Sequence, residues 1–144
     1  MAKVKVVGAA LWTPEGKLVM QRRGPDQRNP GMLGLYGVRV EPREAAETAL
    51  RRELREEMLW RKGREPAYLR ARRIGTFALK CDPDPTITID YTLFSVGVPS
   101  EPDFLDLEGA GSELHSWCGV LDRTDLTPAA GLVLTQAKAE FDRI

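Results

Sequence analysis

The sequence predicts an α+β fold, in which helices pack on a mixed β-sheet. Three observations carry this prediction: a first segment that is apolar on both faces, later stretches that alternate as half-buried strands do, and two segments with apolar residues at helical spacing. Their order is strand, strand, loop, helix, strand, strand, loop, strand and helix. With 144 residues and a mass of 16.1 kDa, we expect a single domain spanning residues 1–144.

The N-terminal part of the chain predicts a β-hairpin. Lys3 to Trp12 is apolar on both faces from Val6 onward, as expected of a strand in the middle of a sheet. Pro14-Glu15-Gly16 is a turn, and Lys17 to Arg23 alternates apolar and polar residues, so it is the expected hairpin partner. Gly24 to Gly34 contains two prolines and three glycines and is expected to be an exposed loop.

The segment from Glu44 to Leu59 predicts the first helix. No Gly or Pro interrupts it, and its apolar residues follow the helical period. The residues at every fourth position are Ala46, Leu50, Leu54 and Met58.

The remaining elements follow from alternation and turn signals. Phe77 to Val98 is expected to be a second hairpin, because apolar residues alternate with Thr and Asp after the turn at residues 82–85. Ser100 to Ser112 is expected to be an acidic loop, and Leu114 to Val120 a short strand.

A last helix is expected to begin at Thr127-Pro128. Thr is a favoured N-cap residue, and Pro is favoured at the first helical position. One apolar stripe then runs along the segment toward the C-terminus and predicts the buried face of this helix. The stripe consists of Leu134, Ala137 and Phe141.

Composition excludes several classes of function. Twenty-one Lys and Arg balance 21 Asp and Glu, so neither a nucleic-acid polymer nor an anionic membrane is an expected partner. No apolar run reaches the length of a membrane helix. Cys81, Cys118 and the single histidine, His115, lack metal-site or disulfide spacing, and we expect a cytoplasmic protein. A small anionic substrate is compatible with these features.

An acidic cluster on the first predicted helix indicates a cation site. Glu53, Glu56 and Glu57 are spaced at i, i+3 and i+4, so their carboxylates share one helix edge and repel one another. A Mg²⁺ ion would turn this repulsion into binding, since it takes carboxylate oxygens as ligands. The alternative is a solvated helix held by pairs such as Glu47 with Arg51.

The surrounding residues favour the cation site, because residues 37–44 and 52–60 together resemble the Nudix box, G-x5-E-x7-R-E-U-x-E-E-x-G-U with U aliphatic. The residues in register are Glu44, Arg52, Glu53, Leu54, Glu56 and Glu57. The resemblance, to MutT-type Nudix hydrolases, implies a mixed β-sheet sandwiched between helices. Two box glycines are replaced, by Val38 and Leu59. Val38 disfavours a positive φ, and Leu59 suggests that the helix runs on to a cap at Gly63.

The resemblance also implies Mg²⁺-dependent hydrolysis of a diphosphate bond in a nucleoside diphosphate linked to a further group X, with Mn²⁺ as an alternative cation. It implies metal ligation by Glu53 and Glu57, with Glu56 as ligand or water-orienting base. A backbone carbonyl near Gly37 is a further expected ligand. On a later loop Glu108 is favoured as another ligand over Glu113, with an ordinary acidic surface loop as the alternative. Arg52 is expected to fix the carboxylates by hydrogen bonding, and Glu44 is a plausible partner at the helix start.

The substrate side of the site rests on three residues. Arg22 and Arg23 end the second expected strand, where they could grip phosphate oxygens, although solvated strand-end charges are the alternative. Tyr36 could stack on a base, although packing is the alternative. The small-molecule nucleotide expected first is a nucleoside triphosphate or a damaged nucleotide. Neither Gly75 nor Thr76 is the proline of ADP-ribose-cleaving relatives.

Several alternatives stay open on this evidence. Nucleotide sugars, dinucleoside polyphosphates and capped RNA ends are other substrate classes. A non-catalytic nucleotide-binding module of the same fold and a plain interaction domain are other functions. The oligomeric state is also open, with a homodimer as one alternative.

Overall fold

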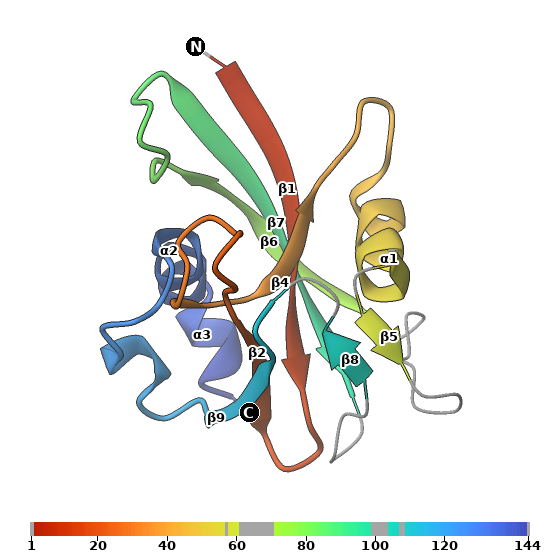
Figure 1. Ribbon diagram of the computed structural model, residues 1–144, viewed down its shortest axis with the longest axis vertical. Helices are drawn as coiled ribbons and strands as arrows, with labels where there is room; N and C mark the ends of the chain where they lie inside the picture. Colours follow the sequence, from red (N-terminus) through yellow and green to blue (C-terminus); the bar gives the residue numbers. More distant parts are fainter. Residues whose placement is uncertain (1, 57, 61–70, 99–103, 107–108, 144) are drawn as a thin grey trace.

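A mixed β-sheet forms the centre of the computed structural model (Figure 1). The structure describes residues 2–56, 58–60, 71–98, 104–106 and 109–143, with the backbone alone at residues 56, 58–60 and 104–106. The strand order is β3-β2-β1-β7-β6; β4 also pairs with β1, and β9 with β2. These strands are β1 (Ala2–Trp12), β2 (Lys17–Arg22), β3 (Leu33–Gly34), β4 (Tyr36–Arg39), β6 (Arg72–Leu79), β7 (Ile87–Gly97) and β9 (Ser112–Ser116).

Strand β1 runs through the middle of this sheet. It lies parallel to β7, from the pair Ala2–Ile87 to the pair Trp12–Gly97, and antiparallel to β2 and β4. Every residue from Val7 to Leu11 that has a side chain is buried. The predicted central strand and its hairpin with β2 are therefore confirmed.

Helices cover both faces of the sheet (Figure 1). Helix α1 (Ala46–Glu56) lies on one face, whereas α2 (Pro128–Gln136) and α3 (Lys138–Phe141) lie on the other. A short 3-10 helix, η2 (Val120–Asp122), precedes α2. The mixed sheet between helices that the sequence predicted is confirmed. None of the helices in the described residues is long and apolar enough to cross a membrane.

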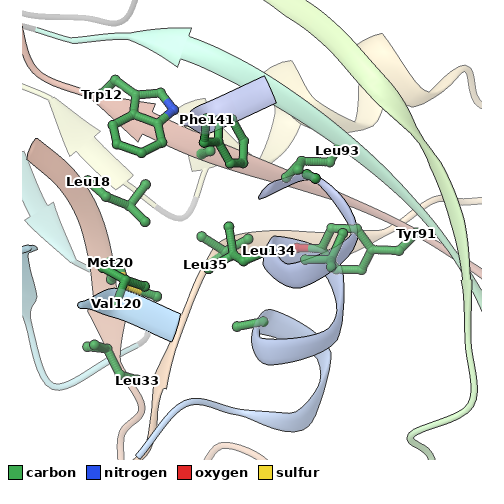
Figure 2. Close-up of a cluster of buried hydrophobic side chains, with 14 of the residues drawn as sticks. Trp12, Leu18, Met20, Leu33, Leu35, Tyr91, Leu93, Val120, Leu134 and Phe141 are labelled. Atoms are coloured by element: carbon green, nitrogen blue, oxygen red, sulfur yellow. The ribbon is translucent and has the colours of Figure 1, made fainter. Parts of the chain in front are cut away.

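Two apolar clusters hold these layers together. Between the sheet and α2, Figure 2 shows side chains from β2, β7 and the last helices packed against one another. The predicted stripe is part of this cluster: Leu134, Ala137 and Phe141 are at most 2% exposed. On the other face, the α1 cluster contains Val7, Leu11, Tyr36, Ala49, Leu50, Leu54 and Phe94. Removing this apolar surface from water stabilises the fold by about 25 cal/mol per Å².

The second hairpin forms, although β6 begins at Arg72 rather than at Phe77, and the predicted last helix is divided at Ala137 into α2 and α3. Strands β6 and β7 pair antiparallel around the turn at residues 80–86, and a hydrogen bond of 3.0 Å joins the hydroxyls of Thr76 and Thr92. Thr127 caps α2, because its Oγ1 accepts from the Ala130 amide at 3.2 Å. Strand β9 begins at Ser112, earlier than the predicted Leu114, and ends at Ser116.

The end of the first helix differs from the prediction. Helix α1 ends at Glu56, and Met58–Trp60 forms β5, which pairs antiparallel with β8 (Phe104–Asp106). The predicted helix end at Leu59 and the uninterrupted loop at residues 100–112 are therefore wrong. Both segments carry adjacent apolar residues, which suit a strand pair as well as a helix. Gly63, the predicted cap, lies outside the described residues.

Candidate active site

Helix α1 carries Glu53 on its buried side. Ala49, Leu50 and Leu54 anchor the helix against the sheet, and one helical turn places Glu53 beside them with 3% of its surface exposed. Taking an ionised carboxylate out of water costs several kcal/mol unless opposite charge or hydrogen bonds compensate. Such a position suits a group that faces a cation, and the chemistry of a hard oxygen donor fits Mg²⁺ or Mn²⁺.

The start of α1 is fixed by Arg52. Its guanidinium donates to both carboxylate oxygens of Glu44, at 3.0 and 3.1 Å, and to the Arg39 carbonyl at 3.0 Å. This guanidinium, with the Glu41 amide, holds the pKa of Glu44 below its ordinary value. Arg52 therefore joins the helix to the end of β4 through Glu44, whereas its expected hydrogen bonding to the metal-binding carboxylates stays a prediction.

Strand β4 brings the expected metal-binding backbone against β1. Gly37 lies opposite Gly8, and a Cβ at Gly37 would stand 2.8 Å from the Val7 carbonyl oxygen. Gly37 is thus required for the close approach of the two strands. Val38 lies in β4 with ordinary extended backbone: among the described residues other than glycine, only Asn29 and Arg43 have a positive φ. The first box glycine can accordingly be replaced here without strain.

Some of the expected ligands lie beyond what the structure describes. Glu57 and Glu108 are outside the described residues, and Glu56 is described by its backbone alone. Within the described part of the chain, no group of three His, Cys, Asp or Glu side chains is placed to hold a metal ion. Of the expected metal ligands, the structure therefore describes the Glu53 side chain and the Gly37 backbone.

A cavity of about 530 Å³ opens between the sheet and the start of α2. Arg23, Arg28 and Asp82 are among its lining residues. Gly37 and Tyr91 also line it, and Tyr91 is 5% exposed. Burial and, secondarily, the negative charge of Glu53 raise the pKa of the Tyr91 hydroxyl above its ordinary value.

Glycine makes room for Tyr91 at this cavity. A Cβ at Gly8 would collide with the Tyr91 hydroxyl, and a Cβ at Gly37 would lie 3.5 Å from it. The Gly8–Gly37 strand pair therefore accommodates the ring. In the sequence, Tyr91 is one apolar member of the alternating pattern that predicts the second hairpin. The signal that could have identified it is a bulky polar aromatic opposite paired glycines, which requires the strand register to be known.

Arg23 and Arg22 occupy contrasting environments. Arg23 lines the cavity, and its side chain donates to the Arg28 carbonyl at 3.0 Å and to Gln21 at 3.2 Å. Arg22 instead forms two hydrogen bonds with Glu113, at 2.6 and 2.8 Å, and one of 2.9 Å with Asp125. These contacts engage the Arg22 guanidinium with two carboxylates. The phosphate-binding hypothesis is therefore carried forward on Arg23.

Tyr36 lies in the core rather than at the cavity. It is 1% exposed and belongs to the α1 cluster, so its ring has no open face on which a base could stack. This burial fits the packing alternative. Arg28 and Asp82, which the sequence analysis did not single out, line the cavity instead.

Comparison with known proteins identifies similar folds. The family model described as NUDIX domain matches residues 2–140. No protein of curated function matches the sequence significantly.

Three solved structures are similar over most of the chain. DR0079 from Deinococcus radiodurans is 24% identical (TM-score 0.72; 93% of this chain and 82% of that one). A MutT NUDIX hydrolase from Burkholderia pseudomallei is 20% identical (TM-score 0.71; 94% and 98%). The NUDIX domain of Shewanella oneidensis NrtR, complexed with ADP ribose, is 18% identical (TM-score 0.72; 97% and 89%). At these identities the likeness shows the fold alone.

Proposed function

The chain belongs to the NUDIX domain family of pyrophosphohydrolases, and from that premise we propose that it hydrolyses a diphosphate bond in a nucleoside diphosphate derivative with the help of Mg²⁺. Mn²⁺ is the alternative cation. A nucleoside triphosphate or a damaged nucleotide is the first substrate class, and nucleotide sugars and dinucleoside polyphosphates are the next.

One observation carries the proposal: Arg23 lines the same cavity as Gly37, the expected backbone partner of the buried Glu53. A substrate whose phosphates contact Arg23 would thus extend along Gly37 toward the carboxylates of α1. The arrangement pairs a cavity lined by Arg23 and Arg28 with the edge of α1 that carries Glu53, as hydrolysis of an anionic substrate assisted by a cation requires.

The chain's own residues have distinct roles in this proposal. Glu53 and Glu57 would hold the cation together with the carbonyl of Gly37, and Glu108 would be a further ligand. Glu56 serves as ligand or as the base that orients the attacking water. A bound divalent cation supplies charge neutralisation and lowers the pKa of that water.

Two arginines support these groups in different ways. Arg52 orients the start of the helix through its bidentate contact with Glu44. Arg23 donates hydrogen bonds to the phosphate oxygens as they take up charge. Its guanidinium already contacts the Arg28 carbonyl, so the loop after β2 keeps it in place before substrate arrives.

A second candidate function is nucleotide binding without hydrolysis. The Shewanella NUDIX domain complexed with ADP ribose shows that this fold accommodates a nucleotide derivative, and the replaced box glycines would fit a departure from catalysis. The strain-free backbone at Val38 and the retained box carboxylates favour the enzyme.

Turnover of a substrate panel tests the proposal. Nucleoside triphosphates, oxidised nucleotides, nucleotide sugars and dinucleoside polyphosphates are incubated with the protein, with and without millimolar Mg²⁺, and released phosphate or pyrophosphate is measured. We expect cation-dependent release from at least one class, and a loss of at least about 100-fold in Glu53→Gln. Glu47→Gln, on the same helix but half exposed and paired with Arg73, is the matched control. Binding of a panel member without release would favour the second function.

A further inference from the structure

The loop between β2 and β3 is held in a defined shape. The Arg23 amide donates to the Met32 carbonyl at 2.8 Å, and the Gly31 amide donates to the Arg23 carbonyl at 3.0 Å. Arg22 donates to the Gly31 carbonyl at 3.1 Å. Asn29 and Gly31 have φ angles of 53° and 76°, and these left-handed residues turn the loop back on itself. The Arg28 carbonyl, which accepts from Nε of Arg23, is thereby fixed at the edge of the cavity.

The Arg28 side chain forms an ion pair beside the cavity. Its Nη2 lies 3.3 Å from Oδ2 of Asp82, which belongs to the turn between β6 and β7. The two side chains differ in exposure: 72% for Arg28 and 13% for Asp82. The Asp82 carboxylate is held in place, because its Oδ1 accepts from the Asp84 amide at 2.9 Å. A solvated cation therefore meets a fixed and largely buried anion at the rim of the cavity.

We propose that the Arg28–Asp82 ion pair is a latch on the cavity, in which Asp82 competes with the substrate's phosphates for Arg28. When a diphosphate enters, the Arg28 guanidinium leaves Asp82 and binds phosphate oxygens, while Arg23 keeps the loop in place. Asp82 thus sets the anion affinity of the site, and Arg28 is a substrate-binding residue. This inference deepens the proposed function and rests on it for the identity of the ligand.

The energetics allow such an exchange. Arg28 is 72% exposed and is solvated on both sides of the exchange, and Asp82, which is 13% exposed, keeps its hydrogen bond from the Asp84 amide when the pair opens. A diphosphate carries more negative charge than one carboxylate and offers several oxygens to the planar fork of a guanidinium. Arg28 therefore has a stronger partner in the substrate than in Asp82. The pair still opposes entry of neutral or weakly charged molecules, which give Arg28 no replacement contact.

The matched substitutions come from one turn. Asp82→Asn removes the charge that holds Arg28 but keeps the oxygen that accepts from the Asp84 amide. Asp84→Asn removes one negative charge two residues away; in the structure Asp84 contacts Thr86. Comparing the two separates release of Arg28 from a general loss of negative charge near the cavity. Thermal unfolding of each variant verifies that the turn is retained.

Calorimetric binding of inorganic pyrophosphate without divalent cations tests the latch. We expect Asp82→Asn to lower Kd about three- to tenfold and Arg28→Ala to raise it about tenfold, consistent with the loss of one charge-assisted contact. Asp84→Asn should stay within about twofold of wild type. In the double variant Arg28→Ala/Asp82→Asn, Kd should equal that of Arg28→Ala, because Asp82 acts through Arg28.

Three results would overturn the latch. The first is an equal change of Kd in Asp82→Asn and Asp84→Asn, and the second is no pyrophosphate binding by any of these proteins. The third is a lower Kd from Asp82→Asn that persists when Arg28 is Ala. Because no turnover is measured, failure of the latch leaves the hydrolysis proposal to the substrate panel. Conversely, if no panel substrate is hydrolysed but the Kd values of the single and double variants change as expected, the latch is retained and the enzyme is rejected.

Discussion

Arg23 and Arg55 test, at the scale of single residues, where the substrate's phosphates bind. Arg23 lines the cavity, whereas Arg55 is exposed on α1. A charge-assisted hydrogen bond contributes roughly 1.5–3 kcal/mol, so Arg23→Ala should lower kcat/KM about ten- to a hundredfold. Arg55→Ala, the matched control, should stay within about fivefold of wild type. Steady-state kinetics on the best panel substrate measures both, and equal behaviour would place the phosphates elsewhere.

Val38 tests whether the missing box glycine matters. Val38 lies in β4 with extended backbone and packs partly against the α1 cluster. Val38→Gly would remove this packing and loosen the unfolded chain, so it should lower the free energy of unfolding by about 1–3 kcal/mol. Urea denaturation measures the loss. If the substitution instead stabilised the fold or raised kcat/KM tenfold, Val38 would be a strained replacement.

Residue identities were easier to predict than residue environments. The box register of Glu44, Arg52 and Glu53 is a matter of spacing along the chain, whereas the Arg52–Glu44 contact was not predicted from it. The environments of Arg22 and Tyr36 depend on partners distant in sequence: Glu113 and Asp125 for the arginine, and the packing of α1 for the tyrosine. Spacing carries no information about such partners.

At the scale of elements, the N-cap of α2 connects stability with the cavity, since Thr127 lines the cavity and is 8% exposed. Thr127→Ala removes the acceptor for the Ala130 amide and should lower the free energy of unfolding by about 1 kcal/mol. Thr127→Ser, which keeps the hydroxyl, should lose less than half of that. Chemical denaturation of the two variants makes the comparison, and an alanine variant as stable as the serine variant would show that the cap contributes nothing.

The apolar periodicity of the sequence predicted well which helices and strands form. It predicted poorly the residues at which they begin and end. The central strand β1 and the β6–β7 hairpin followed from apolar patterns and turn residues. The end of α1 did not, because Met58–Trp60 continues an apolar pattern that a helix and a strand can share. Its strand state comes from pairing with Phe104–Asp106, a contact between segments far apart along the chain. Local propensity cannot decide between states that a distant partner selects.

At the scale of the whole molecule, a charge network gives stability a pH dependence. Hydrogen bonds from Arg22, and secondarily from His115, lower the pKa of Glu113 to about 2. Arg123 and Arg22 likewise hold the pKa of Asp125 below its ordinary value. The network joins β2, β9 and the segment before α2. Acid should therefore loosen the contacts among these three parts of the fold.

The sign of this effect follows from the depressed pKa. The ionised Glu113 stabilises the folded state at pH above about 4.5, the ordinary value, and this contribution is lost as pH falls from about 4.5 to about 2. Glu113→Gln should lower stability at pH 7 and make its decline between pH 5 and pH 2 shallower than in wild type. Urea denaturation at several pH values measures both. Parallel pH curves for the two proteins would contradict the assignment.

The measurement that tests the central claim most directly is calorimetric titration of Mg²⁺ and Mn²⁺ into the protein without substrate. The claim is that the α1 carboxylates, with the buried Glu53 among them, form a divalent-cation site. The wild type should bind a cation, and its melting temperature should rise accordingly. Glu53→Gln should bind the cation at least about tenfold more weakly than wild type. Without cation, its stability should equal or exceed that of wild type, because a buried charge is removed. A flat wild-type titration and an unchanged melting curve, or equal binding by Glu53→Gln, would contradict the account.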